Sequence, residues 1–130
     1  KDSCSHEFKK WIIFFKYYLS ITKETQEKRL AARQDDPLKR WKISPIDELA
    51  QKNFDEYTKA KEEMFARTHT PYTPWIVVDA NDKKIARLNI IKDILLHIEY
   101  DGKEDSKVSL MTDPNVVMLY SRLIQNLHDN

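Results

Sequence analysis

Glycine is nearly absent from this sequence, with Gly102 the only one among 130 residues. A loop that wraps phosphate groups with backbone N–H groups needs several glycines at fixed spacing, as in GxxxxGK[ST] or GxGxxG. These 130 residues hold no such loop. Any anion site in them must therefore be built from side chains.

Cysteine is equally scarce, because Cys4 is the only one. A single cysteine excludes an internal disulfide and suits a reducing compartment. It also excludes a zinc site of the usual cysteine-rich kind, since the four histidines are scattered along the chain. We predict no metal ligands in this sequence. The histidines are His6, His69, His97 and His128.

Long apolar runs are missing as well. The longest run, WIIFF at 11–15, is far short of the roughly 20 residues that a membrane helix needs. Residues 1–10 are charged and no small-residue cleavage site follows them, so the sequence shows no secretory signal. We predict a cytoplasmic protein that does not enter a membrane.

Positive charge is concentrated locally, although the whole chain carries a net charge of only +1. Residues 1–22 sum to +2, residues 23–42 to +3 and residues 43–130 to −4. Such a balance gives no global attraction to polyanions, so an anion site must be local. Five cations gather around a break at Pro37: Arg29, Arg33, Lys39, Arg40 and Lys42.

Apolar patterning and helix start signals predict alternating strands and helices. The runs at 11–21 and 75–79 are typical of buried strands in a parallel sheet. Helices are predicted over 22–34, 44–67, 81–98 and 113–130, with a turn and linker at 101–108. Two strands do not make a stable sheet, so this α/β pattern indicates part of a larger one.

Finer expectations concern how these helices begin and pack. Thr22 is the predicted N-cap of the first helix, and Ser44 with Pro45 and Asp47 starts the second, which we expect to bend near Asn53. The last helix is expected to start at Asp113 and Pro114. The helix over 81–98 carries one apolar face, the side that packs on a core in an amphipathic helix: Ile85, Leu88, Ile91, Ile94 and Leu95.

The cations around Pro37 allow three interpretations: a solvated surface, a nucleic-acid patch or a mobile clamp for phosphates. Arg29 and Arg33 are four residues apart and share one helix face. With the cations at 39–42 they could line a groove that suits a phosphate chain, because arginine binds two oxygens at once and lysine acts as a mobile point charge. Trp41 is interpreted as a packing anchor, and Ser44 with Asp47 as a helix start.

A second group of polar residues follows the strand at 75–79, where open α/β sheets bind ligands. These residues are weaker candidates for approaching a nucleotide, and a helix cap supplied by Asp79 or Asn81 is the favoured alternative. The group comprises Asp79, Asn81, Lys83 and Arg87.

The order of residues resembles one family over about residues 11–100. The shared elements are arginines before a DP pair, KRWKISPID at 39–47, YTKAKEEMF at 57–65, THTPYTPWIVV at 68–78 and NDKKIARLN at 81–89. They are similar to the C-terminal half of family-2 polyphosphate kinases. Asn81 replaces an aspartate of that pattern.

The resemblance implies a P-loop kinase fold of the thymidylate-kinase type, with a three-layer parallel sheet of which this chain holds the helix-rich C-terminal part. It implies phosphoryl transfer between inorganic polyphosphate and a nucleoside mono- or diphosphate such as ADP, with ATP as product or donor, and with Mg²⁺. The segment 23–67 would be a lid over the phosphates, with Arg29, Arg33, Lys39, Arg40 and Lys42 as its cations. Residues 1–100 would be part of the kinase domain, and 101–130 a linker and terminal helix.

The resemblance also implies what these residues lack. The Walker A and Walker B segments of the family precede the matched region, so we expect this chain to be a fragment that is inactive alone, and the full protein to be a homo-oligomer. Two alternatives remain open: a non-catalytic module that binds polyphosphate or nucleic acid, and a structural fragment that needs another half to fold.

Overall fold

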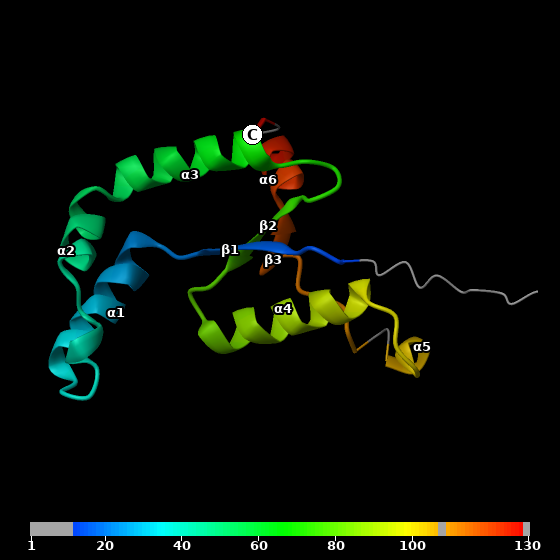
Figure 1. The fold of residues 1–130 in the computed structure, drawn as a ribbon, viewed down its shortest axis with the longest axis horizontal. Coiled ribbons are helices and arrows are strands. Elements are labelled where there is room, and N and C mark those ends of the chain that lie inside the picture. Colours follow the sequence, from blue (N-terminus) through cyan, green and yellow to red (C-terminus); the bar gives the residue numbers. More distant parts are fainter. Residues whose placement is uncertain (1–11, 107–108, 129–130) are drawn as a thin grey trace, which may run out of the picture.

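The computed structural model describes residues 12–106 and 109–128 as an α/β arrangement (Figure 1). Its helices and strands are, in chain order, β1 (Lys16–Ser20), α1 (Lys23–Asp35), the short 3₁₀ helix η1 (Arg40–Lys42), α2 (Pro45–Lys52), α3 (Phe54–Thr68), β2 (Trp75–Asp79), α4 (Lys83–His97), α5 (Lys103–Ser106), β3 (Val117–Leu119) and α6 (Tyr120–His128).

The three strands form one mixed sheet in the order β1-β2-β3. β1 pairs parallel with β2, so that Ser20 lies beside Asp79 at the carboxyl ends of both strands. β3 pairs antiparallel with β2, with Val117 beside Val78. The α/β class is confirmed, but the expectation of two strands in a purely parallel sheet is wrong.

The predicted helix over 113–130 is present only in its second part, as α6, and its expected start at Asp113 and Pro114 is wrong, because β3 lies between that point and α6. The carbonyl of Asp113 accepts hydrogen bonds from the N–H groups of Val116 and Val117, which turns the chain before β3. The β-branched residues that follow then pair with the edge of β2. A helical spacing of apolar residues could not reveal this, because the strand depends on the edge that β2 offers.

The first strand is shorter than the predicted 11–21. Its pairing begins at Lys16, which lies opposite Trp75 of β2. The residue before Trp75 is Pro74, which has no N–H group to donate to a neighbouring strand. Residues 12–15 therefore precede the paired part of the sheet, and residue 11 lies outside the described residues.

Most predicted helix starts and ends are confirmed. The Thr22 side chain caps α1, and α1 ends before Pro37. Ser44 and Asp47 form a capping box with Pro45 at the first position of α2, and Asn53 separates α2 from α3. The expected cap of α4 is wrong, because Asp82 accepts the N–H groups of Lys84 and Ile85 instead.

Helices cover both faces of the sheet, α3 and α6 on one side and α4 on the other (Figure 1). Val78 in β2 is fully buried and packs with Ile76, Ala80 and Ala86. On the other face, the Phe65 ring contacts the rings of three aromatic residues, at centroid distances of 4.7 to 5.4 Å: Tyr18, Trp75 and Tyr120.

The apolar face predicted for α4 is only partly buried: Ile94 and Leu95 are partly buried, but the rest of the face is exposed. Ile85, Leu88 and Ile91 are about half exposed, whereas the buried residues are Ala86, Asn89 and Asp93. The two polar residues are tolerated there because each has partners. Asn89 accepts the N–H of Asp113 and donates to the carbonyl of Ile85, and Asp93 accepts a hydrogen bond from Tyr17. Within the described ranges, no helix is long and apolar enough to cross a membrane.

Replacing Tyr17 tests the contact between β1 and α4. The Tyr17 hydroxyl donates to Asp93 at 2.5 Å, and the Asp93 side chain is only 10% exposed. We expect Tyr17→Phe to lower the free energy of unfolding by about 1–3 kcal/mol, because the buried carboxylate loses its donor. Urea denaturation measures the change. Tyr72→Phe, at a side chain that is 94% exposed, is the control and should change nothing; equal effects of the two variants would contradict the role of Tyr17.

The same contact predicts a dependence on pH. Burial, then the neighbouring Asp93, raises the pKa of the Tyr17 hydroxyl from its ordinary value of 10.0. Above pH 10 the unfolded chain loses this proton while the folded chain keeps it, so stability that is complete below pH 10 is lost as the pH rises. Tyr17→Phe has no such ionisation, and the difference in unfolding free energy between it and the unaltered chain should shrink between pH 9.5 and 11. A constant difference across that range would disprove the linkage.

Candidate functional site

Three cations meet in a cavity of about 200 Å³ where α1, α2 and the first turn of α4 converge. We call this cavity the cation pocket. Asp47 is the only acidic residue in its lining, so the pocket has an excess of positive charge. It is lined by Ile21, Gln26, Arg29, Leu30, Arg33, Asp47 and Lys83.

Arg29 fastens the middle of α1 to the loop that follows β2. Its Nη2 atom donates to the carbonyl oxygens of Ala80 at 2.6 Å and Asn81 at 2.9 Å. The backbone N–H of Thr22 donates to the Asn81 side chain at 3.0 Å in the same region. The Nη2 end of the Arg29 guanidinium is therefore occupied by backbone carbonyl oxygens.

Arg33 lies one turn further along α1 and faces α2. Its Nη1 atom is 3.9 Å from Oδ1 of Asp47, and both side chains are partly exposed. The other oxygen of Asp47 accepts the backbone N–H of Ser44 at 3.0 Å. Asp47 thus starts α2 and holds a long, weak ion pair with Arg33, which leaves most of the guanidinium donors of Arg33 open to an incoming anion.

Lys83 enters the pocket from the first residue of α4. The preceding residue, Asp82, accepts the N–H groups of Ile85 and Lys84, and these hydrogen bonds hold the pKa of its carboxyl group below the usual value. The nearby Arg29 charge acts in the same direction. Because Asp82 is occupied as the helix cap, its charge is directed at the backbone of α4.

The other three predicted cations lie at the turn between α1 and α2, away from the pocket lining. Lys39 pairs with Asp36 at 2.6 Å. This hydrogen bond, and a second one from the backbone N–H of Leu38, lower the pKa of the Asp36 carboxyl. Arg40 donates to the carbonyl of Gln34 at 2.8 Å. The Lys42 ammonium lies 5.2 Å from the centre of the Trp41 ring. Each cation has a local partner that an anion could replace or supplement.

Trp41 is not the packing anchor that the sequence suggested. Its side chain is 78% exposed, and its Nε1 atom donates to the carbonyl of Leu38 at 2.9 Å. The neighbouring Leu38 is also exposed. The ring is therefore held in one orientation by its own turn, with most of its surface in solvent.

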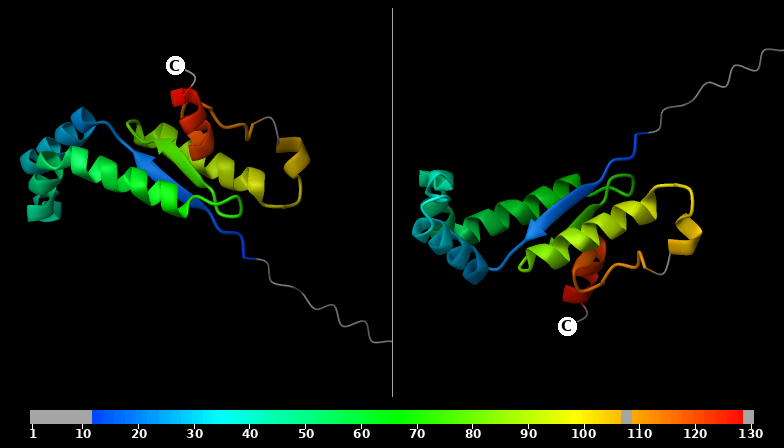
Figure 2. Two further views of the ribbon diagram at one scale, coloured as in Figure 1. Left: turned by 90° about the horizontal axis from the view of Figure 1, so that it is seen from above. Right: turned by 90° about the horizontal axis from the view of Figure 1, so that it is seen from below.

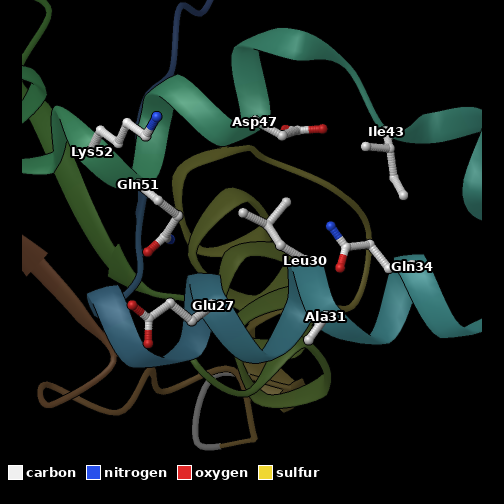
Figure 3. Close-up of a pocket in the computed structure, with 8 residues that line it drawn as sticks. All are labelled: Glu27, Leu30, Ala31, Gln34, Ile43, Asp47, Gln51 and Lys52. Atoms are coloured by element: carbon white, nitrogen blue, oxygen red, sulfur yellow. The ribbon is translucent and has the colours of Figure 1, made fainter.

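A second cavity, of about 390 Å³, separates α1 from α2 (Figure 3). Leu30 and Ala31 of α1 and Ile43 before α2 form its apolar wall, and Gln51 points from α2 toward α1 (Figure 3). The Gln51 Nε2 atom donates to the side chain of Gln26, while its Oε1 atom is buried without a hydrogen-bond partner. The two helices are therefore incompletely packed against each other. The sequence carried no pattern that pointed to this glutamine pair.

The residues after β2 are only partly brought to the pocket. Lys83 lines it, whereas Asp79 and Asn81 line a separate cavity of about 280 Å³ between the sheet ends and the segment before β3. Asp79 accepts the N–H of Asn81, which shapes the loop. Arg87 is exposed on α4 outside both linings. Across the described part of the chain, no group of three or more acidic, histidine or cysteine residues could hold a metal ion.

Comparison with known proteins places these residues in a family. The family model for Polyphosphate kinase 2 matches residues 7–106. An NDP-polyphosphate phosphotransferase 2 of Ruegeria pomeroyi is 45% identical over 114 residues, which are 88% of this chain and 33% of that protein. A GDP-polyphosphate phosphotransferase of Pseudomonas aeruginosa is 44% identical over 114 residues, 88% of this chain and 32% of that protein.

Solved structures agree with this assignment. The crystal structure of Polyphosphate Kinase 2 from Arthrobacter aurescens TC1 superposes with a TM-score of 0.60 at 33% identity, over 75% of this chain and 39% of that one. A putative polyphosphate kinase 2 from Pseudomonas aeruginosa gives a TM-score of 0.59 at 40% identity, over 64% of this chain and 18% of that one. The chain spans about a third of the length of the relatives named above, and it belongs to the polyphosphate kinase 2 family.

Proposed function

We propose that this chain is the lid-bearing part of a polyphosphate-dependent nucleotide phosphotransferase. It would help to move a phosphoryl group between inorganic polyphosphate and a nucleotide such as ADP, with ATP on the other side of the reaction. Family membership supports the reaction class, and the cation pocket is the observation that carries the proposal for these residues. The proposed fold of the whole domain is P-loop kinase-like, which the parallel β1–β2 pair between helical layers supports.

The chemistry of phosphoryl transfer explains why such a part would be rich in cations. The transfer needs the phosphates positioned and their charge neutralised more than it needs covalent help. Arg33 and Lys83 are the proposed phosphate ligands in the pocket, because neither is tied to a backbone carbonyl in the described structure. Arg29 would contribute charge while it anchors the start of the lid.

The lid would be the segment from α1 to α3, with its tip at η1. Lys39, Arg40 and Lys42 lie on that tip and are held only by exposed local contacts. An exposed ion pair such as Lys39–Asp36 contributes little stability, so a polyphosphate chain could take this cation at low cost. Closure of α1 and α2 on the core would then add tip cations to those of the pocket.

Magnesium would neutralise phosphate charge in such a reaction. The residues described here do not fit a site for it, since they contain no cluster of three candidate ligands. Ligands from another part of the domain are therefore required in the proposal, as is a phosphate-binding loop. By themselves these 130 residues are proposed to be inactive, in a cytoplasmic protein whose full form is a homo-oligomer.

Binding of long-chain polyphosphate tests the two groups of cations separately. We expect Arg33→Ala/Lys83→Ala to weaken binding about tenfold or more, and Lys39→Ala/Arg40→Ala/Lys42→Ala to do the same, because each change removes charge-assisted hydrogen bonds to phosphate. Lys28→Ala/Lys59→Ala, at two exposed lysines outside the pocket lining, should have little effect. Isothermal titration with excess duplex DNA present measures selectivity. Equal losses in all variants, with DNA as an equal competitor, would instead favour a non-selective polyanion-binding module.

The anchoring role of Arg29 has its own test. Arg29→Ala should lower the free energy of unfolding by about 1.5–3 kcal/mol, since the carbonyls of Ala80 and Asn81 lose a charged donor. Hydrogen exchange should also speed up in the middle turn of α1, around Arg29. Arg67→Ala is a matched control at an exposed ion pair with Glu63 and should cost less than about 1 kcal/mol. If the two variants are equally stable, Arg29 is not an anchor.

A further inference from the structure

We propose that a cavity between α4, β3 and the start of β2 is a second ligand site, which takes a guanine nucleotide with its base against Asp93 and its phosphate against Arg122. We call this cavity the edge pocket. It begins at Pro74 and Ile76, whereas the cation pocket lies beyond the carboxyl ends of β1 and β2. The inference does not rest on the proposed phosphoryl transfer, so the two can fail separately.

The edge pocket is built between α4 and the chain that follows it. The segment between α5 and β3 returns alongside α4 (Figure 2). There the Asp113 N–H donates to the Asn89 side chain at 2.8 Å, and the Lys92 ammonium donates to the Met111 carbonyl at 3.4 Å. Six of the ten lining residues follow residue 106, where the family match ends, so most of the wall is supplied from outside the matched region.

The size and lining of the edge pocket suit a small organic molecule. Its volume is about 520 Å³, and sites for small molecules are mostly clefts of roughly 300–1,000 Å³ with apolar walls and a few polar groups. A flat ring could pack against the apolar part of this wall. That part consists of Pro74, Ile76, Pro114, Val117, Met118 and Leu119.

Asp93 brings a nearly buried carboxylate to the edge pocket, with a side chain that is only 10% exposed. Its Oδ2 atom accepts the Tyr17 hydroxyl at 2.5 Å. Its Oδ1 atom lies 3.7 Å from Nδ1 of His97, and that nitrogen donates to the backbone carbonyl of Asp93 at 2.7 Å. The contacts described for the chain therefore give Oδ1 no hydrogen bond, and a carboxylate oxygen removed from water gains most from a donor that reaches it.

Arg122 brings a cation to the same cavity from the first turn of α6, where it is exposed. Within the residues that the structure describes, its guanidinium has no hydrogen bond and no ion pair. Asp93 and Arg122 thus line one cavity without pairing with each other. A molecule that bridges them needs hydrogen-bond donors at one end and an anionic group at the other, because the two residues carry opposite charges.

A guanine nucleotide carries both of these ends on an apolar ring system. The N1–H and N2–H donors of guanine lie side by side, so they can meet the two oxygens of one carboxylate as a guanidinium does. The phosphate oxygens suit the fork of donors that an arginine presents. Adenine suits Asp93 less well, since an acceptor nitrogen lies next to its amino group and would face a carboxylate oxygen.

Isothermal titration of the 130-residue chain with four ligands tests the assignment without any substitution. GMP should bind most tightly. IMP lacks the N2 amino group, AMP lacks both guanine donors and guanosine lacks the phosphate, so we expect AMP and guanosine to bind about tenfold or more weakly than GMP, with IMP between AMP and GMP. Equal affinities for GMP, IMP and AMP, or no binding of GMP at millimolar concentration, would overturn the proposal.

Substitutions assign the two ends of the ligand. Arg122→Gln should weaken GMP binding about tenfold or more and leave guanosine binding unchanged, because only GMP has the phosphate. Arg67→Gln, at an exposed arginine outside the edge pocket, is the matched control. Asp93→Asn retains an oxygen for the Tyr17 hydroxyl but should remove the preference for GMP over IMP and AMP. Equal losses for Arg122→Gln and Arg67→Gln, or an unchanged base preference in Asp93→Asn, would contradict the assignment.

Two further variants separate the edge pocket from the cation pocket. Leu119→Trp places a larger side chain in the lining of the edge pocket and should abolish GMP binding while polyphosphate binding stays unchanged. Arg33→Ala/Lys83→Ala should leave GMP binding unchanged. The opposite pattern would place the nucleotide in the cation pocket and overturn the proposal. A chain that binds GMP as expected but does not bind polyphosphate would support the edge pocket and count against the proposed function.

Discussion

The parallel pairing of β1 with β2 is the constraint on which the rest of the structure depends. Its register places Ser20 beside Asp79, so the chain leaves both strands at the same end of the sheet. The chain after β1 and the loop before α4 therefore meet. There the Arg29 side chain donates to the carbonyls of Ala80 and Asn81, and the Asn81 side chain accepts the N–H of Thr22. The cation pocket exists because two helices that are distant in sequence are fixed at one point.

Positive charge is used in two different ways around this point. In the pocket, Arg29 donates to carbonyl oxygens, whereas Arg33 has only a long ion pair with Asp47. Lys83 lines the pocket beside them. At the turn near η1, the cations have exposed partners on the same short segment. This arrangement supports the proposed lid, whose base would stay in register while its tip exchanges partners. The incompletely filled cavity between α1 and α2 fits the same view.

Burial in this chain is distributed unusually for its composition. Asn89 and Asp93 of α4 are buried with hydrogen-bond partners, while Ile85, Leu88 and Ile91 on the same helix are exposed. Leu19 in β1 is exposed as well. Hydrophobic burial dominates the stability of a domain, so apolar residues left outside indicate that the described core is smaller than the sequence can support.

The sequence by itself predicted the helix caps, the helix breaks and the family. Caps and breaks at Thr22, Pro37 and Asn53 depend on neighbours a few residues away. The apolar run at 75–79 predicted a strand, and the motif order identified the family. What the sequence could not give was the outcome of competition between distant segments. The strand β3 took the first part of a predicted helix because β2 offered an edge, and α6 kept the rest. Asp82 rather than Asp79 or Asn81 capped α4, and the hydrogen bond from Tyr17 holds Asp93 in the buried face of α4 while more apolar residues stay exposed. Spacing along a chain fixes which residues share a face, but only tertiary packing decides which face is buried, because that choice depends on the partners each polar group finds.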